Sequence, residues 1–111
     1  PVNHMIHTIG IRVECKQTAK VLAYSCDTEP CEQTVRLAGG ADILIHEAGG
    51  AAYGHSSAEQ AGEIATKAEV GILYLIHYPT GRFAQGNLAA EAGKTYKGEV
   101  VVAEDFMTIE I

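Results

Sequence analysis

The segment Ile43-Leu44-Ile45-His46-Glu47-Ala48 decides the fold class, because an apolar run ends directly in a histidine and an acid. Three consecutive aliphatic residues shortly after Gly39-Gly40 are typical of a short buried strand. A helix is predicted to precede this strand. It would begin at Thr28, whose hydroxyl can cap the first turn, and end at Gly39-Gly40, with Cys31, Val35 and Ala38 on its inner face.

The same alternation of strands and helices continues on both sides of this segment. Before it, residues 9–14 and 20–24 predict a hairpin. After it, Ser56 and Glu59 form a capping-box signature for a helix reaching Val70, and residues 72–76 predict a buried strand. A third helix is marked by Leu88, Ala92 and Tyr96, and strands are predicted at 99–102 and 107–111. The order ββαβαβαββ predicts one α/β domain over residues 1–111 with a largely parallel sheet.

Composition and charge limit the possible functions. A net charge of −6 argues against direct nucleic-acid binding by this chain alone, since no broad phosphate-neutralising surface is available. The apolar runs are far shorter than the roughly 20 residues of a membrane-spanning helix, so no membrane association is expected. Three cysteines without a CxxC spacing indicate reduced thiols and a cytoplasmic location. The chain opens at Pro1 without a Met, which indicates a true start further upstream.

Polar side chains that could perform chemistry follow the predicted strands. The carboxyl ends of parallel strands line the ligand crevice of such sheets, and Asp27, Glu47 and His77 each stand at a strand end. His55 closes a Gly-rich loop before a helix. Each residue alone has a structural interpretation. Asp27 could cap a helix, His77 and His55 could be hydrogen-bonded structural histidines, and Glu47 could form a salt bridge or backbone contact.

His4 and His7 have the HxxH spacing of a helical metal pair. The segment that follows them is strand-like, however, and in a strand the two side chains would face opposite ways. A local two-histidine site is therefore not expected. His4 could still meet His77 if the ends of their segments converge.

Six short motifs in this order resemble the metallo-β-lactamase fold hydrolases, most closely the ribonuclease Z-like branch. Tyr24-Ser25-Cys26-Asp27-Thr28 resembles the family's Tyr-Ser-Gly-Asp-Thr turn, residues 44–48 its Leu-Ile-His-Glu-Ala strand, and Gly54-His55-Ser56-Ser57 its Gly-His-Ser-Thr helix start. The family's His-x-Val-Pro-x-x-Gly-Tyr-Arg strand resembles residues 4–14, and its Thr-His-Phe segment resembles residues 76–78. Its closing strand resembles residues 103–107.

The resemblance implies that the chain is the C-terminal half of an αββα sandwich. It further implies that His4 binds a first metal, Asp27 bridges two metals and His77 binds the second, with zinc as the expected ion and manganese possible. His55 would stabilise or protonate the reacting group, with Glu47 behind it. In this chemistry a metal-bound hydroxide attacks a phosphodiester or related ester.

The chain also departs from the family pattern. The motif His-x-His-x-Asp-His, which lies in the family's N-terminal half, is absent. The resemblance therefore implies an incomplete site and a sheet face that needs the missing half, another subunit or a second copy as partner. Cys26 replaces a glycine, which raises the questions of whether the turn has a positive φ and whether the thiol is a soft ligand or a packed side chain. Residues 78–83 match the family's Ser-x-Arg-Tyr segment only loosely and with an insertion, which weakens an assignment to transfer RNA.

Two other functions remain open. A non-catalytic binding or assembly module derived from the same fold would keep the same residues at its strand ends. A doubly wound signalling receiver with Asp27 as phosphoacceptor is disfavoured, because the paired acidic cluster and lysine loop of such sites are missing.

Overall fold

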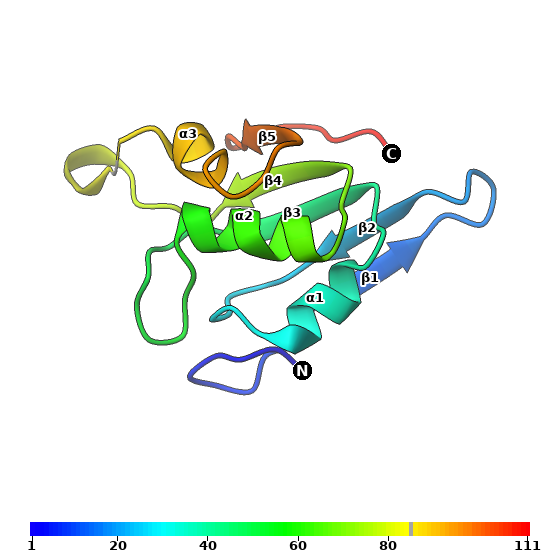
Figure 1. The fold of residues 1–111 in the computed structure, drawn as a ribbon, viewed down its shortest axis with the longest axis horizontal. Coiled ribbons are helices and arrows are strands. Elements are labelled where there is room, and N and C mark those ends of the chain that lie inside the picture. The colour runs from blue at the N-terminus through cyan, green and yellow to red at the C-terminus, as the bar shows by residue number, and fades with distance from the viewer. Residues whose placement is uncertain (85) are drawn as a thin grey trace.

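The computed structural model describes residues 1–84 and 86–111 and shows a five-stranded sheet with helices on one face (Figure 1). The strands are β1 (Ile11–Glu14), β2 (Val21–Tyr24), β3 (Ile43–Glu47), β4 (Ile72–Ile76) and β5 (Glu99–Val102). The helices are α1 (Glu32–Ala38), α2 (Ala58–Lys67) and α3 (Leu88–Ala92), with a 3₁₀ turn, η1 (Gly81–Phe83), between β4 and α3. The predicted α/β class is confirmed.

The sheet topology explains why one face is open. The spatial order is β1-β2-β3-β4-β5, with β1 antiparallel to β2 and all other neighbours parallel. Right-handed crossovers that all step in the same direction place their helices on the same face of a sheet. The carboxyl ends of β2, β3 and β4 consequently lie side by side at one edge.

The core lies between the sheet and the three helices. Alternate strand residues point toward the helices, and small side chains on α2 allow close approach of helix and sheet. The fully buried members include Ala23, Leu44, Leu73, Leu75, Ala61 and Ala65. The opposite face carries Leu22, Tyr24, Ile45 and Tyr74, which are partly exposed, together with Ile11 and Val13, which are 46% and 48% exposed. No helix among the described residues covers that face.

Two predicted helix starts are wrong. Helix α1 begins at Glu32 with Cys31 at the N-cap position, and Thr28 is instead buried, accepting a hydrogen bond from the Asn3 amide. The capping box of α2 is formed by Ser57 and Gln60, one residue beyond the predicted pair. Ser56 is buried, and its hydroxyl donates to the Thr28 carbonyl oxygen. In both places a polar residue suited to capping makes a tertiary contact.

Other element boundaries also differ from the predictions. Residues 107–111 form no strand, so the last β of the predicted order is wrong, and β1 starts at Ile11. An alternating pattern is not sufficient for a strand, which also needs a partner edge. Helix α3 ends at Ala92, and Tyr96 lies beyond it in the core, donating to the carbonyl oxygens of Val70 and Gly71. On the inner face of α1, Ala38 is buried and Val35 packs against the core as predicted, whereas Thr34 is buried in place of Cys31.

The longest helix, α2, has 10 residues, and none of the helices in residues 1–84 and 86–111 has the length and apolar character to cross a membrane.

Candidate metal centre

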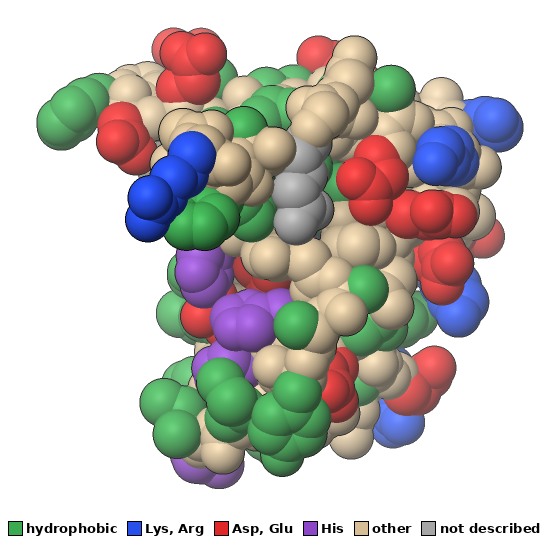
Figure 2. Space-filling view, turned by 90° about the vertical axis from the view of Figure 1, so that its left-hand side faces the viewer, with side chains coloured by type: hydrophobic (Ala, Val, Ile, Leu, Met, Phe, Trp, Pro, Cys, Tyr) green, Lys and Arg blue, Asp and Glu red, His purple; other side chains and the backbone are tan. Residues whose placement is uncertain are grey.

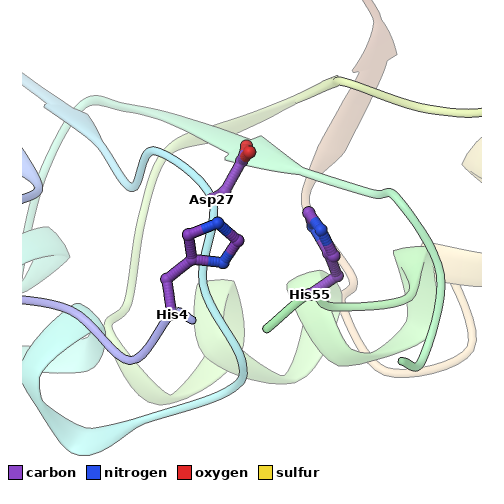
Figure 3. A group of neighbouring side chains, drawn as sticks. All are labelled: His4, Asp27 and His55. Carbon is purple, nitrogen blue, oxygen red and sulfur yellow. The ribbon is translucent and has the colours of Figure 1, made fainter. Parts of the chain in front are cut away.

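The carboxyl edge of the sheet brings together the five predicted site residues. Asp27 follows β2, Glu47 ends β3 and His77 follows β4, while His55 precedes α2 and His4 comes from the N-terminal segment. Potential ligand atoms of His4, Asp27 and His55 lie within 4.8 Å of one another (Figure 3). Those of Glu47, His55 and His77 meet the same limit. His55 belongs to both groups, so the five side chains form one continuous cluster.

Each of the three histidines uses Nδ1 for a contact within the chain. His4 Nδ1 lies 2.6 Å from the Gly54 carbonyl oxygen, and His77 Nδ1 lies 2.6 Å from Asp27 Oδ1. His55 Nδ1 lies 3.2 Å from Glu47 Oε1. A carbonyl or carboxylate oxygen can only accept, so Nδ1 donates in each pair. Each Nε2 is then left with a lone pair, the form of imidazole that binds metals.

Glu47 is fully buried, and its carboxylate is surrounded by N–H donors. Oε1 accepts from the backbone amides of Thr28 and Ser56 at 3.2 and 2.9 Å and from His55, and Oε2 accepts from the Gly49 amide at 2.7 Å. These bonds compensate the buried charge and leave little capacity for a metal bond. Glu47 therefore suits orientation of His55 better than direct coordination of a metal.

Glu29 is a positioning residue that sequence reasoning missed. Its Oε2 accepts from Asn3 Nδ2 at 2.6 Å and its Oε1 accepts from the Gly54 amide at 3.0 Å. Its own amide donates to the Asn3 carbonyl oxygen at 2.7 Å. Glu29 thus fastens the segment carrying His4 to the loop leading to His55. These contacts join residues about 25 positions apart in the sequence, so no local sequence pattern could predict them.

Two residues at this edge have left-handed backbones. Cys26 has φ 55° and His77 has φ 49°, a region that costs non-glycine residues about 1 kcal/mol or more. The turn at position 26 therefore does have the positive φ that a glycine would adopt cheaply. The Cys26 thiol belongs to neither group of potential ligands within the described residues, which favours a packed side chain over a soft ligand. His7 is exposed and also lies outside both groups.

Two neighbouring side chains have shifted pKa values. Burial lowers the pKa of His46, which points into the helix side of the core. Its Nδ1 contacts the Glu47 carbonyl oxygen, and its Nε2 has no partner in the described structure. Burial, and then the nearby Cys26 and Asp27, raises the pKa of Tyr24. His46 is thus a neutral core residue and not a fourth histidine of the cluster.

The histidines occupy one face of the molecule between apolar side chains (Figure 2). Met5, Ile6 and Tyr53 are 56%, 72% and 76% exposed. Phe83 is 65% exposed and lines a pocket of about 600 Å³ that also includes His77. A second pocket of about 420 Å³ places His77 beside Glu104 and Asp105. The cluster is therefore accessible from outside, and His77 borders two different pockets.

Comparison with known proteins identifies the class to which this fold and site belong. The model of the Beta-lactamase superfamily domain matches residues 2–78. The chain belongs to the metallo-β-lactamase superfamily. Within that superfamily it is ribonuclease Z-like.

Curated ribonuclease Z proteins support this placement. The one from Methanothermobacter thermautotrophicus is 41% identical over 98 residues, which cover 81% of this chain and 32% of the relative. The one from Thermobifida fusca is 36% identical over 122 aligned positions, covering 96% of this chain and 38% of the relative. The chain thus spans about a third of the length of the curated relatives it matches.

Solved structures show that the fold is part of the metallo-β-lactamase fold. YhfI from Bacillus subtilis, a metallo-β-lactamase fold protein, superimposes with a TM-score of 0.82 at 28% identity, over 93% of this chain and 44% of that protein. The short form of human tRNase Z gives a TM-score of 0.72 at 28% identity, over 99% of this chain and 40% of that protein.

Proposed function

We propose that this chain supplies one side of a two-metal hydrolase site that cleaves a phosphodiester or related ester. His4 and His77 would bind separate ions, zinc or manganese, and Asp27 would bridge them. The proposal rests on the orientation of His4 and His77: each Nδ1 donates to an oxygen of the chain, which leaves each Nε2 for a metal. The donor set of imidazoles and one carboxylate suits these ions.

The chain's own residues then have distinct roles. When bound, the metal ions would supply a nucleophilic hydroxide at neutral pH and would stabilise charge on the ester oxygens. His55 would take up a proton on its free Nε2 and pass it to the leaving oxygen, because its ring adjoins those of both His4 and His77, with centroid separations of 5.1 and 5.4 Å. Glu47 would hold the His55 ring in place through its contact with Nδ1.

The site needs further ligands from outside residues 1–111. Two tetrahedral or five-coordinate ions require more donors than His4, Asp27 and His77 provide. We propose that the chain is the C-terminal half of the αββα sandwich. The missing half, or a second subunit, would add those ligands and would cover the open sheet face carrying Ile11 and Val13. The chain spans about a third of the curated relatives, which leaves most of the length of such a protein to supply these ligands.

Metal titration tests the proposal. Isothermal titration of zinc into the 111-residue chain should show binding that Asp27→Ala weakens by about 10-fold or more, whereas Glu63→Ala, which changes an exposed carboxylate on α2, should not alter it. Unchanged zinc affinity in Asp27→Ala would refute the assigned ligand. In the protein that completes the site, hydrolysis of bis(4-nitrophenyl) phosphate should require Asp27. Metal binding without hydrolysis there would favour the non-catalytic module.

A further inference from the structure

We propose that the turn at residues 79–83 forms a binding pocket for the planar ring of a phosphate ester, directly beside His77. The inference rests on the proposed function and deepens it by naming the substrate class. The pocket has a volume of about 600 Å³ and is lined by Gly49, His77, Tyr78, Pro79, Thr80 and Phe83. This volume lies within the range of small-molecule sites. Because His77 is itself part of the wall, a molecule in the pocket reaches the cluster.

The walls of this pocket are held in place by the fold. The Tyr78 hydroxyl donates to the Ala103 carbonyl oxygen just beyond β5, which fixes the Tyr78 side chain. The turn is closed by two backbone hydrogen bonds, from the Phe83 amide to the Thr80 carbonyl and from the Ala84 amide to the Gly81 carbonyl, at 3.2 and 3.1 Å. An ordered wall is important because a preorganised pocket loses less conformational entropy when its ligand binds.

The chemistry of the pocket favours a flat ring. Tyr78, Pro79 and Phe83 present aromatic and ring surfaces, and the Phe83 side chain is 65% exposed. A single exposed aromatic side chain has no functional meaning by itself, since such residues are common on protein surfaces. Here the ring is part of a formed pocket next to the cluster. Stacking against aromatic side chains is how proteins hold bases and other planar groups.

A cation accompanies the aromatic wall. The guanidinium carbon of Arg82 lies 4.8 Å from the centroid of the Phe83 ring. Figure 2 shows a basic side chain over hydrophobic ones close to the histidines. The chain has a net charge of −6, so an anionic substrate needs a local positive charge to approach. Arg82 lies against the pocket residue Phe83 and would provide that charge to the phosphate attached to a bound ring.

Binding to the metal-free 111-residue chain tests the inference without reference to hydrolysis. In ¹H–¹⁵N NMR titrations, adenosine 5′-monophosphate and phenyl phosphate should shift the amide signals of His77, Thr80 and Phe83. Ribose 5-phosphate, which lacks the ring, should bind at least about 5-fold more weakly. Tighter binding of the nucleotide than of phenyl phosphate identifies a nucleobase site, and the reverse order an aryl site. Both orders support a ring pocket.

Matched variants separate stacking from charge. Phe83→Ala should weaken binding of both ring compounds by about 5-fold or more and leave ribose 5-phosphate unchanged, while Phe83→Trp should retain binding. Phe106→Ala removes the other phenylalanine, which is fully exposed, and should have no effect. Arg82→Gln should weaken all three phosphates. Equal binding of ribose 5-phosphate and the ring compounds, or unchanged binding in Phe83→Ala, would overturn the inference.

Zinc titration of the same samples distinguishes this inference from the proposed function. If Asp27→Ala abolishes zinc binding while no ring preference is seen, only the ring pocket is refuted. If the ring preference holds while zinc affinity does not depend on Asp27, the assigned metal site is refuted and the pocket stands.

Discussion

The buried carboxylate of Glu47 provides the sharpest test of how this site is built. Its two oxygens accept four N–H groups, of which three are backbone amides from the segments after β2, after β3 and before α2. Replacing it by alanine would leave those three amides without their acceptor, those of Thr28 and Ser56 in buried positions and that of Gly49 in a partly buried one. Glu47→Ala should therefore destabilise the fold as well as the site.

The magnitude follows from the unpaired amides. Each buried unsatisfied donor costs about 1–3 kcal/mol, so the two buried amides would cost roughly 2–6 kcal/mol, and the partly buried Gly49 amide adds less. Water entering the space left by the side chain offsets part of this, and we expect a loss of about 3–5 kcal/mol. Glu47→Gln keeps one acceptor oxygen but places an amide NH₂ opposite one of the donors, so it should cost less, about 1–2 kcal/mol.

Urea denaturation followed by circular dichroism measures both losses. Glu63→Ala serves as the control, because Glu63 is exposed on α2 and should change the free energy of unfolding by no more than about 0.5 kcal/mol. A loss below about 1 kcal/mol in Glu47→Ala would refute this account. It would mean that the three segments are held together without the carboxylate, as packing contacts alone could do.

Three further predictions concern single residues. Because the pKa of His46 is lowered in the folded chain, the folded chain binds fewer protons than the unfolded one below about pH 6.5. The free energy of unfolding should therefore fall as the pH drops below that value. Urea midpoints measured across this range should fall less in His46→Leu than in the wild type. Cys26→Gly removes the cost of a left-handed backbone at φ 55° and should raise the melting temperature; a decrease would show that the thiol's packing outweighs the backbone cost. Gly62→Ala should lower the free energy of unfolding by about 1–3 kcal/mol, because the added methyl group would meet the Ala92 carbonyl where α2 contacts α3. This loss should exceed the gain from the higher helix propensity of alanine. Unchanged urea midpoints would contradict this prediction.

The sequence predicted the parts of the fold that depend on local pattern. Short aliphatic runs in the sequence predicted the buried strands β3 and β4 correctly. The polar residues at the carboxyl ends of these strands were also correctly expected to lie at one edge of the sheet. The failures have a common cause. Thr28 and Ser56 are good capping residues that instead make tertiary hydrogen bonds, and residues 107–111 alternate like a strand without forming one. Local propensity is overridden where tertiary contacts compete with it.

The candidate site was predictable in its members but not in their connections. Asp27, Glu47 and His77 could be found because each stands at the end of a strand, and His4 and His55 because their motifs resemble the family's. The hydrogen bonds of Glu29 with Asn3 and Gly54 could not be predicted, because they depend on two loops that meet only in the folded chain. The four donors around Glu47 were anticipated only as a generic backbone contact.

These connections explain how one side of the proposed metal site can be organised within a single short chain. The left-handed residues Cys26 and His77 stand at the ends of β2 and β4, and the pair His77–Asp27 joins those two strand ends. Backbone strain of this kind persists only where the surrounding contacts over-determine the geometry. Here the sheet and the contact at Nδ1 provide that constraint, and the Glu29 and Glu47 networks do the same for His4 and His55. The orientation of the imidazoles is therefore set before any metal binds, so a completing half would need to contribute ligands and cover for the open sheet face without reshaping this edge.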